Sequence, residues 1–189
     1  MPDVSTLIKY AWLTFGVVWL AAAFTSKRTV RRQSAGSRLT QLALGVIAGL
    51  LLWGDIPHMP FLRSPLVSPS PLTAGLAVAL TFLGILIAFW ARFFLGRNWS
   101  GTVTLKQDHE LIQSGPYSVV RHPIYSGILL ALFGTVLVHP RIGGFLAVLV
   151  AALTLRLKSL TEESFMIDRF GMQYLEYQRH VKALIPFVW

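Results

Sequence analysis

The sequence predicts an all-α, polytopic integral membrane protein with about five transmembrane helices and a C-terminal helical hairpin. Three observations support this prediction. The 189-residue chain is 54% hydrophobic but only 13% charged, about half the charged fraction of a soluble domain. Its hydrophobic residues form long runs, and most Lys and Arg residues lie between these runs. This composition excludes a disordered chain, a collagen-like chain and an ordinary water-soluble domain.

The first two spans and the loop after them are predicted from hydrophobic runs and proline content. Residues 7–24 form the first span, and a basic segment follows them in place of a signal-peptide cleavage site. Residues 39–53 form the second run, which is rather short for a span. Residues 55–71 contain five Pro, a density that forbids a continuous helix. We expect an extended loop at the membrane interface, anchored by Trp53 and Phe61.

The third span is the clearest, because residues 72–95 contain no charge before Arg92. At 1.5 Å per residue this run is long enough to cross a core of about 30 Å. Residues 124–138 and 142–155 are shorter apolar runs separated by a tight turn. We expect them to form a helical hairpin that crosses the membrane, followed by a charged, amphipathic tail over residues 156–189.

Basic residues predict the orientation of the chain. They are concentrated in the first loop, in the polar stretch before the hairpin and in the tail, and the positive-inside rule places these segments in the cytoplasm. The N-terminus is then outside and the C-terminus inside, in a prokaryotic inner membrane or, in a eukaryote, the endoplasmic reticulum. The net charge of +9 favours contact with membrane lipids over nucleic acid. We expect the chain to divide into three N-terminal spans in residues 1–95 and a more polar region in residues 96–189.

The motif Arg121-His122-Pro123 precedes the hairpin. Pro123 disfavours a helical His122 and can itself begin the next helix, so the polar pair is predicted to lie at a helix N-terminus. Such an end attracts anionic groups. The alternative is that Arg121 and His122 only mark the membrane interface. Gly127, one turn later, would allow a ligand or another helix to approach closely.

Glu162 and Glu163 form a second polar motif, directly after an apolar run. Acidic residues at a membrane edge are costly unless they are paired or hydrated. Successive helix positions diverge by about 100°, so one carboxylate can face inward and the other solvent. Lys158 lies four residues before Glu162 on the same helical face, and the alternative to a functional role is a surface ion pair.

The tail is predicted to form an amphipathic helix, because Tyr174, Tyr177, Val181 and Ile185 recur at three- to four-residue spacing. A metal site is not expected. The chain has no Cys, and its remaining His residues lack the spacing of metal ligands.

Taken together and in order, the polar motifs between residues 92 and 186 resemble the isoprenylcysteine carboxyl methyltransferase family. Phospholipid N-methyltransferases share the looser R-H-P-x-Y-x-G and E-E parts. The motifs that carry the resemblance are His109-Glu110-Leu111-Ile112, Ser114-Gly115-Pro116-Tyr117, Arg121-His122-Pro123-Ile124-Tyr125-Ser126-Gly127, Glu162-Glu163, Phe170-Gly171, Tyr174, Tyr177, Val181 and Pro186.

The resemblance implies a membrane enzyme that takes S-adenosyl-L-methionine from the cytosol and methylates a lipophilic acceptor, such as the carboxylate of an isoprenylcysteine. It also implies that the catalytic region is residues 96–189 and that its cofactor-binding segments are cytoplasmic. The positions that match cofactor-binding motifs are His109, Glu110, Leu111, Ile112, Tyr117, Arg121, His122, Pro123, Ile124, Tyr125, Glu162 and Glu163. The residues expected to address the acceptor are Arg92, Lys158 and Arg156. Lys158 stands where the family has an Arg, and it lacks the bidentate fork of a guanidinium.

Three alternatives remain open from the sequence. The acceptor could be a phospholipid amine or a thiol, and an amine would require a base such as Glu163 or Glu110. The protein could be an NADPH-dependent membrane reductase, since sterol reductases resemble the C-terminal hairpin. It could also be a non-enzymatic lipid-binding protein.

Overall fold

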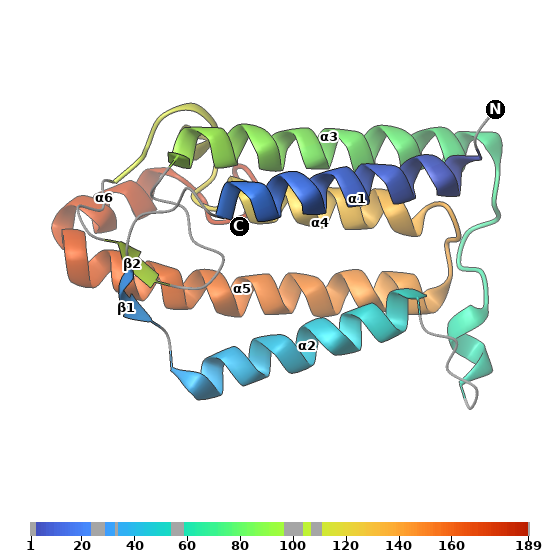
Figure 1. Ribbon diagram of the computed structural model, residues 1–189, viewed down its shortest axis with the longest axis horizontal. Coiled ribbons are helices and arrows are strands. Elements are labelled where there is room, and N and C mark those ends of the chain that lie inside the picture. Colours follow the sequence, from blue (N-terminus) through green and yellow to red (C-terminus); the bar gives the residue numbers. More distant parts are fainter. Residues whose placement is uncertain are drawn as a thin grey trace.

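The computed structural model describes residues 3–23, 29–32, 34–53, 59–96, 104–106 and 111–188. The long helices lie side by side along the long axis of the molecule, and a short helix lies at one end (Figure 1). The α-helices of the described residues are α1 (Val4–Ala23), α2 (Ala35–Trp53), α3 (Pro71–Leu95), α4 (Pro123–Val136), α5 (Ile142–Phe170) and α6 (Met172–His180). The prediction of an all-α, polytopic membrane fold is confirmed.

Among the described residues, four helices, α1, α2, α3 and α5, are long and apolar enough to cross a membrane. α2 begins earlier than the predicted run, because the Ser34 hydroxyl accepts a hydrogen bond from the Ser37 N–H at 3.2 Å and so satisfies a free donor at the helix start. α4 pairs with α5 as the predicted hairpin. Its 14 residues span about 21 Å, less than the hydrocarbon core, so a crossing by α4 stays a prediction.

One short element was not predicted. β1 (Thr29–Arg32) and β2 (Thr104–Lys106) pair antiparallel, and they lie near α6 (Figure 1). The pairing joins the basic first loop to the polar segment before α4 through backbone hydrogen bonds. It therefore brings two of the three basic-rich segments together, in agreement with the prediction that they share one side of the membrane. The compartment on that side stays a prediction.

The proline-rich segment between α2 and α3 contains no α-helix in its described part, as predicted. It contains a 3-10 turn, η1 (Pro60–Arg63), and Pro65 then forms a β-bridge with Arg141 at the start of α5. Of the two expected interface anchors, Phe61 is exposed, whereas the side chain of Trp53 lies outside the described residues. The segment thus docks on the end of the hairpin.

α3 and α4 approach each other very closely, because small residues face each other across the contact. A Cβ atom built on Gly84 would lie 2.4 Å from both the Gly127 carbonyl oxygen and the Ala131 nitrogen. A Cβ on Gly127 would lie 2.5 Å from the Gly84 carbonyl oxygen. Glycine permits this backbone-to-backbone contact. Of the two roles predicted for Gly127, the structure shows the close approach of another helix.

The predicted tail helix is corrected by the structure. α5 ends at Gly171, which adopts a φ of +54°, and α6 then stops at His180. Tyr174 and Tyr177 are buried on α6 as the spacing predicted, but Val181 and Ile185 lie beyond its end. The chain after α6 does not continue as a helix, because its backbone pairs with the segment just before α4.

Candidate active site

Two non-helical segments meet at the end of the helix bundle where α6 lies. Val120 forms a parallel bridge with Lys182. The Arg121 N–H donates to the Lys182 carbonyl at 2.8 Å, and the His122 N–H donates to the Ala183 carbonyl at 3.0 Å. These bonds fix the residues just before α4 against the chain just after α6. They therefore fix the backbone positions from which the side chains of Arg121 and His122 extend.

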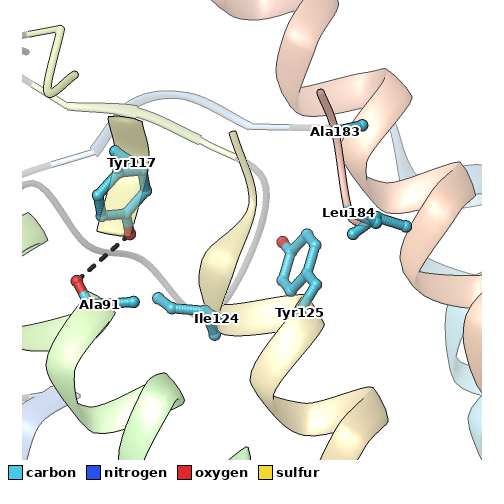
Figure 2. Packing of buried hydrophobic residues seen from close by; sticks show 6 residues of the cluster. All are labelled: Ala91, Tyr117, Ile124, Tyr125, Ala183 and Leu184. Carbon is cyan, nitrogen blue, oxygen red and sulfur yellow. Dashed lines mark hydrogen bonds between the residues drawn. The ribbon is translucent and has the colours of Figure 1, made fainter. Parts of the chain in front are cut away.

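A buried hydrophobic cluster lies next to this pairing and includes Ala183 from it (Figure 2). It joins α3, the segment before α4, α4 itself and the C-terminal segment. The Tyr117 hydroxyl donates to the Ala91 carbonyl at 3.3 Å, and the Tyr177 hydroxyl donates to the Tyr117 carbonyl. Burial raises the pKa of both tyrosines above the ordinary value, so both stay neutral donors. The cluster consists of Ala91, Tyr117, Ile124, Tyr125, Ala183 and Leu184.

Glu163 of α5 lies at the centre of a buried polar network. One carboxylate oxygen, Oε1, accepts from Arg121 Nε at 2.9 Å and Arg121 Nη2 at 2.7 Å. The same oxygen lies 3.0 Å from His122 Nε2. The other oxygen, Oε2, accepts from the Gln178 amide at 3.0 Å. Both carboxylate oxygens are thus bound within the protein, and Glu163 joins α5, α6 and the segment before α4.

Glu162, the neighbouring residue, is placed differently. Its Oε1 accepts from the Tyr125 hydroxyl at 2.5 Å, and its Oε2 lies 3.5 Å from His122 Nδ1. The Glu162 side chain keeps 26% of its surface exposed, against 7% for Glu163. A carboxylate accepts about four hydrogen bonds, so Glu162 retains both surface and lone pairs for a ligand. As expected for adjacent helix positions, the two acids face different surroundings: Glu163 is enclosed, and Glu162 is partly accessible.

His122 lies between the two carboxylates and touches each with a different ring nitrogen. Burial alone would lower its pKa, but hydrogen bonds to Glu162 and Glu163 and their charges outweigh burial and raise the pKa. A protonated His122 together with Arg121 balances the two carboxylates. The imidazole also stacks on Tyr125, with a ring separation of 5.4 Å and 3° between the ring planes. His122 thus holds the whole cluster in one geometry.

The three residues predicted to address the acceptor lie in different surroundings. Lys158 Nζ lies 5.3 Å from the centre of the Tyr125 ring, beside the cluster. Arg156 donates to the Ser159 hydroxyl at 3.1 Å. Arg92 is buried at the end of α3, where its guanidinium donates to the carbonyls of Gly96 and Ala22.

The structure thus brings five predicted residues together directly, namely Arg121, His122, Tyr125, Glu162 and Glu163. Pro123 is the first residue of α4, which explains why the polar pair lies at the helix start. Ile112 packs against the hydrophobic cluster, and Leu111 precedes it in the same segment. His109 and Glu110 lie outside the described residues.

Gln178 is a functional candidate that the sequence did not indicate. It lies on α6, and its amide reaches Glu163. The same face of α6 carries Tyr174 and Tyr177, both buried. The available signal was a polar residue one position after a Tyr on the predicted amphipathic tail helix. Nothing in its spacing distinguishes it from a solvent-facing Gln.

No group of three or more His, Asp or Glu residues that could hold a metal ion occurs within the described parts of the chain. His109 and Glu110 are not among these described residues. The charged cluster is accounted for by its own ion pairs and hydrogen bonds, in which each acid has a basic or hydroxyl partner.

Comparison with known proteins gives matches over the same part of the chain. The model of the family described as phospholipid methyltransferase matches residues 72–173. Protein-S-isoprenylcysteine O-methyltransferase B of Arabidopsis thaliana is 29% identical over 119 residues, which cover 61% of this chain and 60% of that protein. Protein-S-isoprenylcysteine O-methyltransferase of Schizosaccharomyces pombe is 32% identical over 99 residues, which cover 49% of this chain and 41% of that protein.

A longer match is to a probable protein-S-isoprenylcysteine O-methyltransferase of Oryza sativa subsp. indica. It is 30% identical over 178 residues, which cover 89% of this chain and 87% of that protein. This chain thus spans only about half of the Arabidopsis thaliana and Schizosaccharomyces pombe proteins, whereas the rice protein is matched over most of its length.

Proposed function

This chain belongs to the phospholipid methyltransferase family, and from that membership and its buried acidic cluster we propose that it is an integral membrane methyltransferase that uses S-adenosyl-L-methionine. The observation that carries the proposal is the contact of one imidazole, His122, with both Glu162 and Glu163. It joins the two motifs of the chain into one polar site at the end of the bundle.

The residues present suit this cofactor chemically. S-adenosyl-L-methionine carries an ammonium group and ribose hydroxyls, which donate hydrogen bonds, and a sulfonium cation. The Glu162 side chain is partly exposed, and its carboxylate can accept from such donors, while Tyr125 offers an aromatic face for a cation. Because both ring nitrogens of His122 face carboxylates, its proposed role is to hold Glu162 in place for the cofactor.

When bound, the cofactor supplies an electrophilic methyl group, which passes to an acceptor oxygen while the sulfonium becomes a neutral thioether. A carboxylate acceptor needs no deprotonation, so the protein has only to align the reactants and exclude water. In the proposed arrangement Lys158, beside Tyr125, attracts the acceptor carboxylate. The corresponding roles of Arg156 and Arg92 stay predictions from the sequence.

An isoprenylcysteine-like acceptor is favoured over other lipophilic molecules. The relatives described above are named for that substrate, and the acceptor's apolar chain suits a site at the end of membrane-length helices. The family description also names phospholipids. An amine acceptor would have to lose a proton, and Glu162, the less buried acid of the cluster, could take it.

The test measures cofactor binding and methyl transfer separately, with the full chain in detergent micelles. Isothermal titration with S-adenosyl-L-methionine compares the wild type with Glu162→Gln, and with Glu176→Gln as the matched control on the exposed side of α6. We expect Glu162→Gln to weaken binding at least about tenfold, since it removes a charge-assisted contact. The control should bind as the wild type does, and unchanged binding by Glu162→Gln would overturn the site.

The acceptor is tested with labelled cofactor and two substrates, a farnesylated cysteine derivative and phosphatidylethanolamine. We expect transfer to the cysteine carboxylate, with a rate that changes little between pH 6.5 and 8.5. Lys158→Gln should raise KM for that acceptor and leave cofactor affinity unchanged, and Lys158→Arg should restore KM. Transfer to the amine alone, with a rate that rises as pH rises, would replace the carboxylate assignment.

A further inference from the structure

A second site candidate lies at the end of the molecule opposite to the His122 cluster. It is a cavity of about 1020 Å³, bordered by the first half of α1, the end of α2, η1 and the turn between α4 and α5. These elements meet at the end of the bundle where the N-terminus lies (Figure 1). The volume is at the upper limit for small-ligand sites, which indicates a large ligand.

The inner walls of the cavity are apolar. α1 contributes Ile8 and Trp12, and α2 contributes Leu51 and Leu52. The Trp12 indole N–H donates to the Thr135 hydroxyl at 2.9 Å, so its polar atom is satisfied and the ring is held in the wall. These walls would accept hydrocarbon chains.

The rim of the cavity is basic. Lys9, Arg63, His139 and Arg141 border it, and the lining residues in the described part of the chain include no Asp or Glu. All four basic side chains belong to exposed residues. A ligand with an anionic group would therefore find several basic side chains on one rim.

Backbone contacts hold this rim together. The Leu66 N–H donates to the Pro140 carbonyl at 2.8 Å, and the Ile142 N–H donates to the Ser64 carbonyl at 3.1 Å. The segment after η1 is thereby fixed to the turn before α5. The two arginines of the rim, Arg63 and Arg141, consequently belong to one backbone unit whose parts are far apart in sequence.

The geometry points to a binding site for an anionic phospholipid, separate from the methyl-transfer site. The phosphate group would lie on the rim among Arg63, Arg141 and Lys9, and the acyl chains would lie along the apolar walls. A headgroup site at the ends of membrane-length helices is at the depth where lipid phosphates lie. The combination of a basic rim with apolar walls favours an intact lipid over free phosphate, which would use the rim alone.

The experiment measures lipid retention by native mass spectrometry of the full chain, released from micelles that contain equal amounts of phosphatidylglycerol and phosphatidylcholine. We expect the wild type to retain phosphatidylglycerol preferentially. The double variant Arg63→Gln/Arg141→Gln should reduce this retention at least about tenfold. The matched control is Arg38→Gln/Arg169→Gln, which removes the same charge from exposed positions on α2 and α5 and should retain the lipid.

A second measurement keeps the test valid if the double variant folds poorly. Phosphatidylglycerol should raise the unfolding temperature of the wild type above the value in phosphatidylcholine, and inorganic phosphate should not. Equal retention of the two lipids, equal loss in both double variants, or equal stabilisation by inorganic phosphate would each overturn the lipid site. Cofactor titration is expected to be the same in all variants, so the outcome is independent of the methyltransferase proposal.

Discussion

The α3–α4 pair and helix α2 differ in how closely they pack against the rest of the molecule. α3 and α4 pack backbone against backbone at Gly84 and Gly127, and the polar network lies at the end of this pair. α2 packs on α5 but presents a row of exposed apolar side chains, among them Leu42 and Val46. Helices that only cross lipid need length and hydrophobicity, whereas helices that enclose charges must also fit one another closely.

The same division is seen in the family match. The matched residues, 72–173, begin at α3 and end in α6. Every hydrogen bond and ion pair described for Glu162 and Glu163 comes from residues after 120. We therefore expect substitutions in the C-terminal half to affect stability and function much more than the same substitutions in α2.

The largest effect is expected from adding a side chain at the α3–α4 contact. In Gly127→Val, the new Cβ would lie 2.5 Å from the Gly84 carbonyl oxygen and 2.8 Å from the Ala88 nitrogen, and backbone atoms cannot move aside cheaply. We expect a loss of more than about 4 kcal/mol, seen as little folded protein in size-exclusion chromatography.

The matched control for this change is Gly45→Val on α2. A Cβ on Gly45 meets no atom within 4 Å, so we expect a change within about 0.5 kcal/mol. Equal losses of stability from Gly127→Val and Gly45→Val would contradict the difference in packing between the α3–α4 contact and α2.

The next effect concerns the enclosed acid. Glu163→Ala removes the carboxylate that binds Arg121 Nε and Nη2, and leaves a guanidinium whose side chain is only 9% exposed. Breaking a buried pair in this way costs about 3–5 kcal/mol. Unfolding by denaturant in micelles measures this loss.

An exposed ion pair on α6 provides the comparison for Glu163→Ala. Glu176 contacts Arg179 at 3.0 Å, and both side chains are more than half exposed. Glu176→Ala should therefore cost less than about 1 kcal/mol. If Glu163→Ala cost no more than Glu176→Ala, the network would contribute little to stability and the acid would be a surface group.

The membrane fold could be predicted from the sequence largely because hydrophobic length is a local property. The span over Pro71–Leu95 and the hairpin of α4 and α5 follow directly from apolar runs and from Pro123. The contact between His122 and the acidic pair followed from family motifs, because forty residues separate them and no periodicity links them.

What the sequence did not predict depends on contacts between distant segments. The β1–β2 pair, the Gln178 contact with Glu163 and the pairing of Lys182 with Val120 all join residues far apart in the chain. The helical spacing through Val181 predicted a longer tail helix. Backbone pairing with the segment before α4 outweighed that local preference, since it satisfies buried N–H and C=O groups on both sides.

The smallest expected effect is a pH dependence of stability from His122. Its pKa is raised above the ordinary value of 6.5 because, against burial, Glu162 and Glu163 favour the protonated ring. A raised folded-state pKa gives stabilisation that is complete below pH 6.5 and lost as pH rises through the folded-state pKa. Between these two values the free energy of unfolding should fall by at most about 1.4 kcal/mol per pH unit.

Unfolding measured between pH 6 and 9 tests this for the wild type, His122→Gln and His180→Gln. The wild type should lose stability as pH rises, and His122→Gln should lose that dependence because Gln does not titrate in this range. His180 lies on the exposed side of α6, so its substitution should leave the slope unchanged. A wild-type slope that persists in His122→Gln would assign the titration to another group. The contacts of His122 with the two carboxylates would then position the side chains of the site without making stability depend on pH.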